Sequence, residues 1–444
     1  MVKQAARLET VDVTADGQGL VSHAGAALLV ELADRAGLTG GLSAALAETR
    51  ERRSAHDPGR VLRDVAVMLA DGGDCVTDID AYRGQERLFG ARASETTTQR
   101  VLKSVDEQLL GRVRAARAAA RERVWDAGAR PASITLNIDA TLLTAHSDKQ
   151  LAAGTYKHGY GFHPICCYLD ETGEALAAVL RPGNAGSNTA ADHFEVLALA
   201  LEQLPAGDLD REILVRTDIG GATHAFCADC READIRFSVG YELGATVRTA
   251  ILALPGVAWV PAIEPDGEVR DGAWVAELTE HVDLSGWPQA SRLIVRRERP
   301  HPGAQFTVFD DLGYRYTCML TDQTDADIAG LELGHRGRAR VEDSIRQAKD
   351  CGMRNLPHHA FEHNQTWLEL SLIAQDLLCW MRLVCLDGAL AHAEPKRLRH
   401  RLLHVAGRVI NHGRRTRLRL QADWPWASIL VAAFTRLRAI PALC

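Results

Sequence analysis

The chain has 444 residues, of which 46% are hydrophobic and 25% are charged, and its formal net charge is −7. This composition excludes wholesale disorder, and the length suggests two or three domains. The first sixteen residues contain no apolar run, so we expect no secretory signal. Polar residues interrupt the apolar stretch 368–386, which predicts a buried helix and not a membrane span. We therefore expect a cytoplasmic protein with no membrane contact.

The first 130 residues have a helical pattern. Helices are predicted over 25–36, shortly after 38–40, over 58–70 with Pro58 in the first turn, and over 94–125 with Ser94 as the N-cap. Short helices joined by glycine turns allow a helix-turn-helix arrangement. We interpret residues 1–130 as a helical N-terminal region that binds DNA.

The pattern changes after Pro131. Strands are predicted over 134–139, 163–169 and 175–180, and the last two form a hairpin through the turn 170–173. Helices over 188–204 and 222–233 then alternate with strands over 212–218 and 235–241. This order predicts a mixed α/β sheet, so the fold class is α/β, with the first part of the core over 131–252.

Residues 253–320 contain three tryptophans, Pro-Gly turns and short alternating segments, which predict a β-rich insertion. Helices are predicted to resume near Arg338 and to continue to the C-terminus. We assign 321–390 to the second part of the core and 391–444 to a basic, helical C-terminal region.

Charge is concentrated near the C-terminus. From residue 380 onward, twelve Lys or Arg residues stand against three Asp or Glu residues, although the whole chain is acidic. Such a basic block can bind a polyanion through phosphate contacts and release of counterions. The alternative is a solvated helical surface.

Two aspartates occupy equivalent positions, because Asp139 ends one predicted central strand and Asp218 ends another. The carboxyl ends of strands in an α/β sheet usually face the active-site crevice. Two carboxylates on adjacent strands repel each other unless a cation lies between them, and oxygen ligands suit Mg²⁺ or Mn²⁺. The alternative is that each aspartate only caps the element that follows it.

A third carboxylate lies in the charged segment 334–350. If this segment is helical, then Arg338, Glu342, Arg346 and Lys349 share one face at spacings of four, four and three residues. A carboxylate for a metal ion, flanked by cations for phosphates, is what phosphodiester chemistry requires. An exposed helix with ordinary ion pairs remains the alternative.

Four sequence segments together resemble the DDE transposases of bacterial insertion sequences, in the group 1 branch. They are Asn137-Ile-Asp139-Ala-Thr, Tyr156-Lys-His-Gly-Tyr-Gly-Phe-His-Pro164, Val215-Arg-Thr-Asp218 and Arg338-Ala-Arg-Val-Glu342-Asp-Ser-Ile-Arg-Gln-Ala-Lys349. The last segment resembles the Tyr-Arg-Glu-Lys signature of that family, with His335 at the tyrosine position. The resemblance extends from about residue 19 to residue 386.

This resemblance implies an RNase H-like catalytic core in which Asp139, Asp218 and Glu342 are the catalytic residues and ligands of two Mg²⁺ ions, with Mn²⁺ as a substitute. It implies cut-and-paste transposition, in which the protein hydrolyses DNA at the element ends and joins the 3′-hydroxyls to target DNA. The implied partners are the terminal inverted repeats, the target DNA and a second copy of the chain, with a nucleoid-associated location.

Several further residues are candidates for DNA contact. The expected phosphate-binding cations are Arg338, Arg346, Lys349, Lys396, Arg397, Arg399, Arg401, Arg414, Arg415 and Arg417. By the same resemblance, a tryptophan of the insertion would stack on a flipped base, and the candidates are Trp259, Trp274 and Trp287. The alternative for each tryptophan is a place in the β-rich core.

Other classes of function have weaker support. The segment His359-Ala-Phe-Glu362-His363 matches H-x-x-E-H, a zinc-protease pattern, and is retained as a remote alternative. Cys227 and Cys230 have CxxC spacing, but the second pair that a zinc ribbon requires is missing. A catalytically silent, DNA-binding derivative of a transposase is the remaining alternative.

Overall fold

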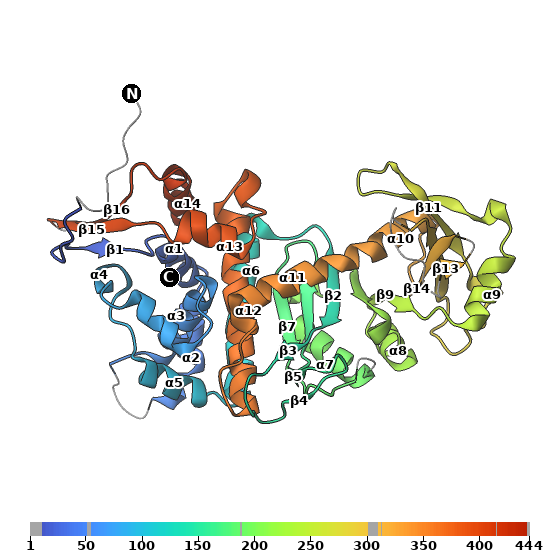
Figure 1. The fold of residues 1–444 in the computed structure, drawn as a ribbon, viewed down its shortest axis with the longest axis horizontal. Helices are drawn as coiled ribbons and strands as arrows, with labels where there is room; N and C mark the ends of the chain where they lie inside the picture. The colour runs from blue at the N-terminus through green and yellow to red at the C-terminus, as the bar shows by residue number, and fades with distance from the viewer. Residues whose placement is uncertain are drawn as a thin grey trace.

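The computed structural model describes residues 11–50, 55–186, 189–300, 310–311, 313–413 and 415–441. The molecule is elongated, with a helical body at one end, a large sheet in the middle and a β-rich part at the other end (Figure 1). The long helix α12 (Phe361–Cys385) stands between the helical body and the sheet. Because it is covered on nearly all sides, α12 is the buried helix that the apolar stretch predicts. Within the described residues, no helix is both long and apolar enough to cross a membrane.

The helical body combines the two ends of the chain. Its N-terminal helices are α1 (Ala26–Arg35), α2 (Leu38–Ala45), α3 (Pro58–Ala70), α4 (Glu86–Phe89), α5 (Glu95–Lys103) and α6 (Glu107–Val124). Near the C-terminus, α13 (Pro395–Leu398) and α14 (Ala427–Ala439) join them, and α14 packs on α1 and α12.

The helix predicted over 94–125 is two helices. Ser94 caps α5 as expected, since its side chain accepts a hydrogen bond from the Thr97 amide. Asp106 begins a second helix in the same way, by accepting from the Leu109 amide. A side-chain cap starts a new helix because it satisfies an amide that has no partner in the preceding turn. The prediction of one continuous helix is therefore wrong at residues 104–106.

The main sheet has ten strands, in the order β10-β11-β12-β14-β9-β8-β2-β6-β7, with β13 paired to β14. The strands of the first part are β2 (Ile134–Ala140), β6 (Ile165–Leu169), β7 (Ala175–Val179), β8 (Ile213–Thr217) and β9 (Arg236–Tyr241). Both β8 and β9 run parallel to β2, whereas β6 is antiparallel to β2 and β7. The helices α7 (Ala190–Leu201) and α8 (His224–Glu232) connect these strands as predicted, and Asn188 lies outside the described residues. The mixed α/β sheet is thus confirmed.

The β-rich stretch extends this same sheet. Its strands are β10 (Val260–Ile263), β11 (Val269–Glu277), β12 (Arg292–Glu298), β13 (Asp310–Asp311) and β14 (Tyr314–Thr321). They add to the sheet edge because β14 pairs antiparallel with β9. The helix α9 (Ala245–Ala253) leads into this part. Helices resume at α10 (Ile328–Arg336), about ten residues earlier than predicted, and α11 (Arg340–Ala348) follows.

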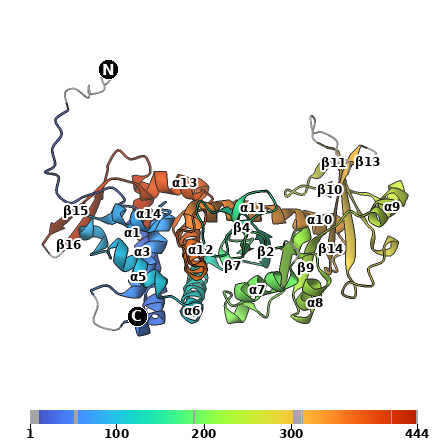
Figure 2. The same cartoon turned by 60° about the horizontal axis from the view of Figure 1, so that its bottom comes forward.

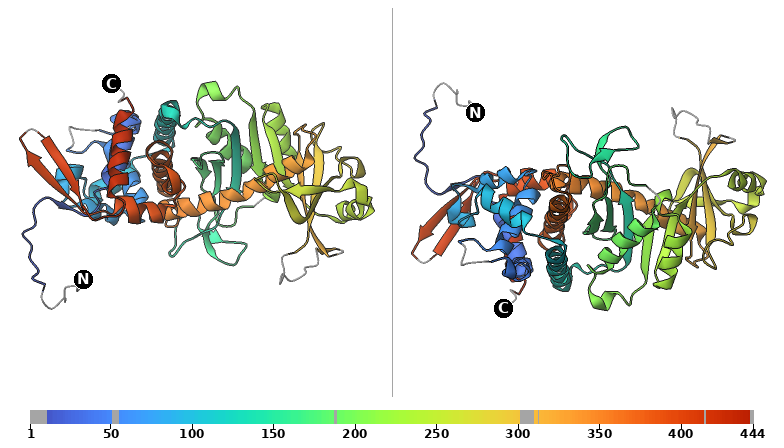
Figure 3. Two further views of the ribbon diagram at one scale, coloured as in Figure 1. Left: turned by 90° about the horizontal axis from the view of Figure 1, so that it is seen from above. Right: turned by 90° about the horizontal axis from the view of Figure 1, so that it is seen from below.

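The C-terminal region is not wholly helical, which corrects the prediction. Strands β15 (Gly407–His412) and β16 (Arg415–Leu420) form a hairpin, and β1 (Leu20–Val21) pairs with β15. The hairpin projects from the helical body at the end farthest from the β-rich part (Figures 2 and 3). A further small sheet joins β3 (Leu143–Thr144), β5 (Tyr160–Phe162) and β4 (Ala153–Gly154) directly after β2.

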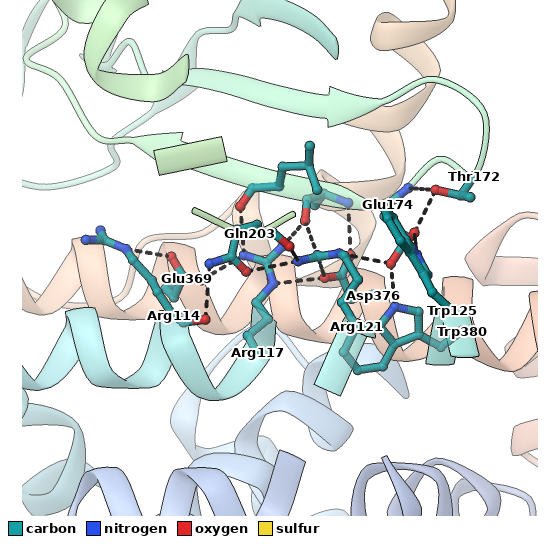
Figure 4. A network of polar contacts seen from close by, with 12 residues as sticks. Arg114, Arg117, Arg121, Trp125, Thr172, Glu174, Gln203, Glu369, Asp376 and Trp380 are labelled. Atoms are coloured by element: carbon teal, nitrogen blue, oxygen red, sulfur yellow. Dashed lines mark hydrogen bonds and ion pairs between the residues drawn. The ribbon is translucent and has the colours of Figure 1, made fainter. Parts of the chain in front are cut away.

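A buried ionic network joins the helical body to the sheet (Figure 4). Arg117 and Arg121 of α6 both bind Asp376 of α12, at 2.8 and 2.5 Å. Arg121 also binds Glu174, which precedes β7, at 3.0 Å. Arg117 binds Glu369 of α12 at 2.8 Å. Because each charge is paired and hydrogen-bonded, the network tolerates burial and fixes α6, α12 and β7 in one arrangement.

Candidate active site

The strand register brings the two predicted aspartates to one edge and one face of the sheet. Parallel pairing of β2 with β8 sets Asn137 opposite Arg216. The side chains of these two residues point to the same face, since the Arg216 Nε donates to the Asn137 Oδ1 at 2.8 Å. Asp139 and Asp218 lie two residues further along each strand, so they extend from the same face as neighbours.

Both aspartates also act as caps, as the alternative interpretation proposes. The Ala140 amide donates to the Asp139 Oδ1 at 2.8 Å, and the Gly220 amide donates to the Asp218 Oδ1 at 2.8 Å. A carboxylate has two oxygens with about four acceptor positions, so one amide contact leaves capacity for another ligand. Capping and cation binding are therefore compatible at both positions.

Asp139 carries the electrostatic signature of the site. Burial first, and then the charges of Asp218 and Glu342, raise its pKa from 3.8 to about 6, while Arg338 opposes them. The Arg338 Nη1 lies 3.7 Å from the Asp139 Oδ2. The three carboxylates thus repel one another at this sheet edge, and a bound cation would relieve that repulsion.

Helix α11 supplies the third carboxylate from across the sheet edge. It packs on β2 and β6, and Glu342 is exposed in its first turn. Lys349, directly after α11, donates from Nζ to the Thr141 Oγ1 at 2.7 Å and to the Leu142 carbonyl at 3.2 Å. Arg338 and Lys349 therefore both reach the end of β2. Because Glu342 lies between them on the same helical face, these two contacts turn Glu342 toward Asp139.

The residues present suit a hard divalent cation. All three ligands are carboxylates, the oxygen donors that Mg²⁺ and Mn²⁺ prefer. Among the described residues, the side-chain oxygens of the three do not all lie within 4.8 Å of one another, so the cluster is open. Burial is the largest cause of the raised pKa of Asp139, and the charges of Asp218 and Glu342 act in the same direction, so a cation at this position would be favourable.

The position of the family tyrosine is occupied by a neutral histidine. Burial, and after it the charges of nearby arginines, lower the pKa of His335 to about 3. The His335 Nδ1 is 2.8 Å from the Ser238 Oγ of β9. His335 thus joins α10 to the sheet through a hydrogen bond and adds no charge to the site.

The predicted DNA-binding cations occupy different environments. Arg399 is buried and donates to the carbonyls of Leu69, Ala70 and Asp350, so its guanidinium is engaged inside the protein in this structure. Hydrogen bonds to three carbonyls make it a structural joint between α3 and the C-terminal region. Arg346 is exposed, but Glu394 and Asp343 bind its guanidinium at 2.9 Å, so it is not free on the face of Glu342.

The remaining cations of the C-terminal region are more accessible. Lys396 lies 3.4 Å from Asp350, Arg397 is exposed, and the Arg401 guanidinium stacks over Trp426 at 4.7 Å. Arg414 lies outside the described residues.

The predicted cations Arg415 and Arg417 lie on the basic face of a hairpin, to which the sequence interpretation assigned neither Arg408 nor Arg419. Its register pairs Arg408 with Arg419, Ile410 with Arg417 and His412 with Arg415. Directly opposed residues share a face, and alternate pairs share the same one, so four arginines extend from one side. On the other side, Val409 is buried. The alternating Arg-Thr-Arg-Leu-Arg-Leu pattern of residues 415–420 is the signal that predicts this strand.

The three candidate tryptophans lie in different contacts. Trp259 is 9% exposed and the Arg297 guanidinium covers its ring at 4.1 Å. Trp274 is half-buried against Arg297 and Tyr314. These two positions agree with the alternative of a place in the β-rich core.

Trp287 contacts the end of β9, the strand next to β8. It contacts Tyr241, with ring centroids 5.6 Å apart, and His224, at 4.3 Å. Since Thr217 pairs with Val239, Tyr241 ends β9 at the same edge at which Asp218 follows β8.

The zinc alternatives are not supported. His359 lies outside α12, which begins at Phe361, so the H-x-x-E-H residues do not share one helix face. Cys227 and Cys230 are buried in α8, and burial raises the pKa of the Cys227 thiol to about 12. Within the described residues, neither motif contributes to a group of metal-ligand atoms.

Two comparisons find known proteins that are similar to this chain. Among solved structures, the cryo-EM structure of the piggyBac transposase synaptic complex with hairpin DNA is similar, with a TM-score of 0.40 and 9% identity over 85% of this chain and 80% of that chain. A comparison with curated proteins finds no match. The sequence model of the transposase DDE domain group 1 family matches residues 3–442. The chain therefore belongs to the transposase DDE domain group 1 family.

Proposed function

We propose that this protein is a cut-and-paste transposase that hydrolyses DNA at the ends of an element and transfers the 3′-hydroxyls to target DNA. Asp139, Asp218 and Glu342 are its catalytic carboxylates. The observation that carries the proposal is the meeting of these three groups at one sheet edge, where burial, and after it the charges of Asp218 and Glu342, raise the pKa of Asp139 to about 6. The family membership supports the same reaction class.

The sheet supports an RNase H-like core. The strand order is β7-β6-β2-β8-β9. Strand β6 is antiparallel to both of its neighbours, and the other four strands run in the same direction. This order places the first strand of the unit, β2, beside the fourth, β8. In this arrangement the ends of β2 and β8 present adjacent carboxylates. The helix with the third carboxylate then crosses the same edge.

The three carboxylates would hold two Mg²⁺ ions, or Mn²⁺ in their place, which would activate the attacking oxygen and stabilise the leaving oxygen. Asp139, whose carboxylate interacts with both other acids, would be one of these ligands. Arg338 would bind a phosphate beside the scissile bond. Lys349 holds the end of β2 in place through the Thr141 hydroxyl.

We assign the chain to the branch with the Tyr-Arg-Glu-Lys signature of bacterial insertion sequences. Arg338, Glu342 and Lys349 occupy the last three positions, and His335 replaces the tyrosine. The hydrogen bond between His335 and Ser238 supplies a link to β9 that a tyrosine hydroxyl could also make.

Two surfaces extend the proposed DNA path. Trp287 is the tryptophan we propose for stacking on a flipped base, because it lies at the edge that carries Asp218. The basic hairpin, with exposed Arg415 and Arg417, is the proposed contact to the terminal inverted repeats. Because two element ends must be held together, we expect the active form to be a dimer. Its DNA substrate would place it on the nucleoid.

The decisive experiment is a cleavage assay on DNA from the flanks of the gene, with Mg²⁺ or with EDTA. We expect cuts at the element ends that require Mg²⁺ and that are lost in Glu342→Gln. Asp343→Asn is the matched control, because Asp343 is also exposed on α11 but binds Arg346.

Two results would contradict the proposal. Normal cutting by Glu342→Gln would remove Glu342 from the site. Absence of cutting together with salt-sensitive binding to the ends would identify a catalytically silent DNA-binding derivative.

A further inference from the structure

A second group of side chains that can bind a metal ion lies in the helical body, apart from the sheet edge that carries the three carboxylates. It consists of His23, Asp71 and His404. One ligand atom from each residue lies within 4.8 Å of the other two. The three residues come from separate parts of the chain: His23 lies between β1 and α1, Asp71 ends α3, and His404 lies just before β15.

The distances within the group are short. The His23 Nδ1 is 2.5 Å from the Asp71 Oδ2, and the His404 Nε2 is 3.1 Å from the Asp71 Oδ1. The centroids of the His23 and His404 imidazole rings lie 4.6 Å apart. Tetrahedral ligands at about 2.0–2.1 Å from one zinc ion stand about 3.3 Å apart. The contact of His404 already has nearly this spacing, and the contact of His23 would lengthen by less than about 1 Å to bring all three residues onto a single ion.

Asp71 is the central residue of the group and is nearly inaccessible. Its side chain is 4% exposed, and its Oδ1 accepts no well-aligned hydrogen bond from the described residues, its partner being the His404 Nε2 at 3.1 Å. The other oxygen accepts a hydrogen bond from the Tyr82 hydroxyl at 3.0 Å. A buried carboxylate oxygen without a well-aligned donor is costly, whereas a metal ligand with an outer hydrogen bond is a common arrangement.

The group also has access to solvent. It lines a surface cavity of ≈ 460 Å³ together with Gly72, Asp78 and Asp80. His404 is 41% exposed and His23 is 24% exposed. An ion can therefore enter, and water can complete its coordination.

We propose that His23, Asp71 and His404 form a structural site for Zn²⁺. Two imidazole nitrogens and one carboxylate oxygen are ligands that zinc accepts and that magnesium does not favour, so this site differs in chemistry from the three carboxylates. In the metal-free protein, ring protons occupy the same positions, and the His404 Nε2 is also 2.9 Å from the Asp71 carbonyl. Zinc would replace these protons and tie the base of the basic hairpin to α3.

The test is the zinc content of tag-free, full-length protein dialysed against excess Mg²⁺, which saturates the carboxylate site. We expect about one zinc ion per chain in the wild type, with loss of that ion in His404→Gln and in His23→Gln. His392→Gln is the matched control, because His392 is exposed in the same C-terminal region. The same ion should remain in Asp139→Asn, which separates this proposal from the proposed function.

A second measurement serves if a ligand variant fails to fold. Titration of the metal-free wild type with Co²⁺ should produce the visible absorption of a nitrogen-ligated ion at about one equivalent per chain. Removal of zinc by 1,10-phenanthroline should lower the melting temperature of the wild type and leave His404→Gln unchanged. The proposal would be overturned if the wild type bound neither Zn²⁺ nor Co²⁺, or bound no more of either ion than His404→Gln does. The three side chains would then be joined by hydrogen bonds only.

Discussion

Replacement of Asp139 by asparagine should make the metal-free protein more stable at neutral pH. In the folded state, burial and the charges of Asp218 and Glu342 raise the pKa of Asp139 from 3.8 to about 6. That rise corresponds to ~3 kcal/mol between the two protonation states. At neutral pH the folded protein therefore carries an ionised group that its surroundings disfavour.

The pH dependence has a definite direction. Below pH 3.8 the carboxyl is protonated in both folded and unfolded chains, so the penalty is absent. As the pH rises toward 6, the unfolded chain loses the proton first, and the folded state loses stability until the penalty is complete. Asp139→Asn removes the ionised form but also the attraction to Arg338, so we expect a net gain of ~1–3 kcal/mol at pH 7.5.

The assay is thermal unfolding in EDTA, at pH 7.5 and at pH 4, of wild type, Asp139→Asn and the control Asp343→Asn. For an unfolding unit of 150–250 residues, each kcal/mol shifts the midpoint by roughly 2–4 °C. Asp139→Asn should melt several degrees higher than wild type at pH 7.5, and the difference should shrink at pH 4. Mg²⁺ should stabilise wild type more than the variant. An Asp139→Asn protein that is less stable than wild type in EDTA at pH 7.5 would refute the reasoning.

Three other substitutions test separate parts of the structure. Asp376→Ala leaves two buried arginines without their shared partner and should cost about 3–5 kcal/mol, seen as a lower melting temperature or insoluble protein; a wild-type melting curve would contradict the network. Arg417→Gln should lower the salt slope of DNA binding by about 1 at unchanged stability, whereas Arg399→Gln should lower stability and leave the slope unchanged. His335→Gln should leave the pH profile of the cleavage rate unchanged between pH 5 and 8, because His335, with a pKa of about 3, is neutral throughout that range. A titration step that is present in the wild-type profile and absent from that of the variant would contradict this expectation.

The sequence by itself determined the order of helices and strands through the core, because periodic burial and turn residues are local signals. The hairpin around Gly173, the buried helix α12 and the strands that end at Asp139 and Asp218 all follow from such signals. The position of Glu342 on a helix with flanking cations also follows from spacing alone. Each of these features is determined by residues that are close to one another in the sequence.

Some local signals were present but were outweighed. Asp106 begins a helix within a stretch that appears continuously helical, and Asp327 caps α10 by accepting from the Ala329 amide. The alternation in 415–420 predicts a strand, but the helices predicted from Arg338 onward were extended to the C-terminus. In each case one polar side chain or a short alternating run decides the structure, and neither changes the average composition of the segment.

Only the tertiary structure decided which charged side chains are available and which are structural. Arg399 is as basic as Arg417, but three carbonyl partners from distant segments bury it. The register of β2 and β8 sets Asp139 beside Asp218, and the meeting of three distant segments at Asp71 places two histidines around one carboxylate. Pairing, burial and electrostatic coupling depend on distances in space between residues far apart in the chain, and no local pattern encodes those distances.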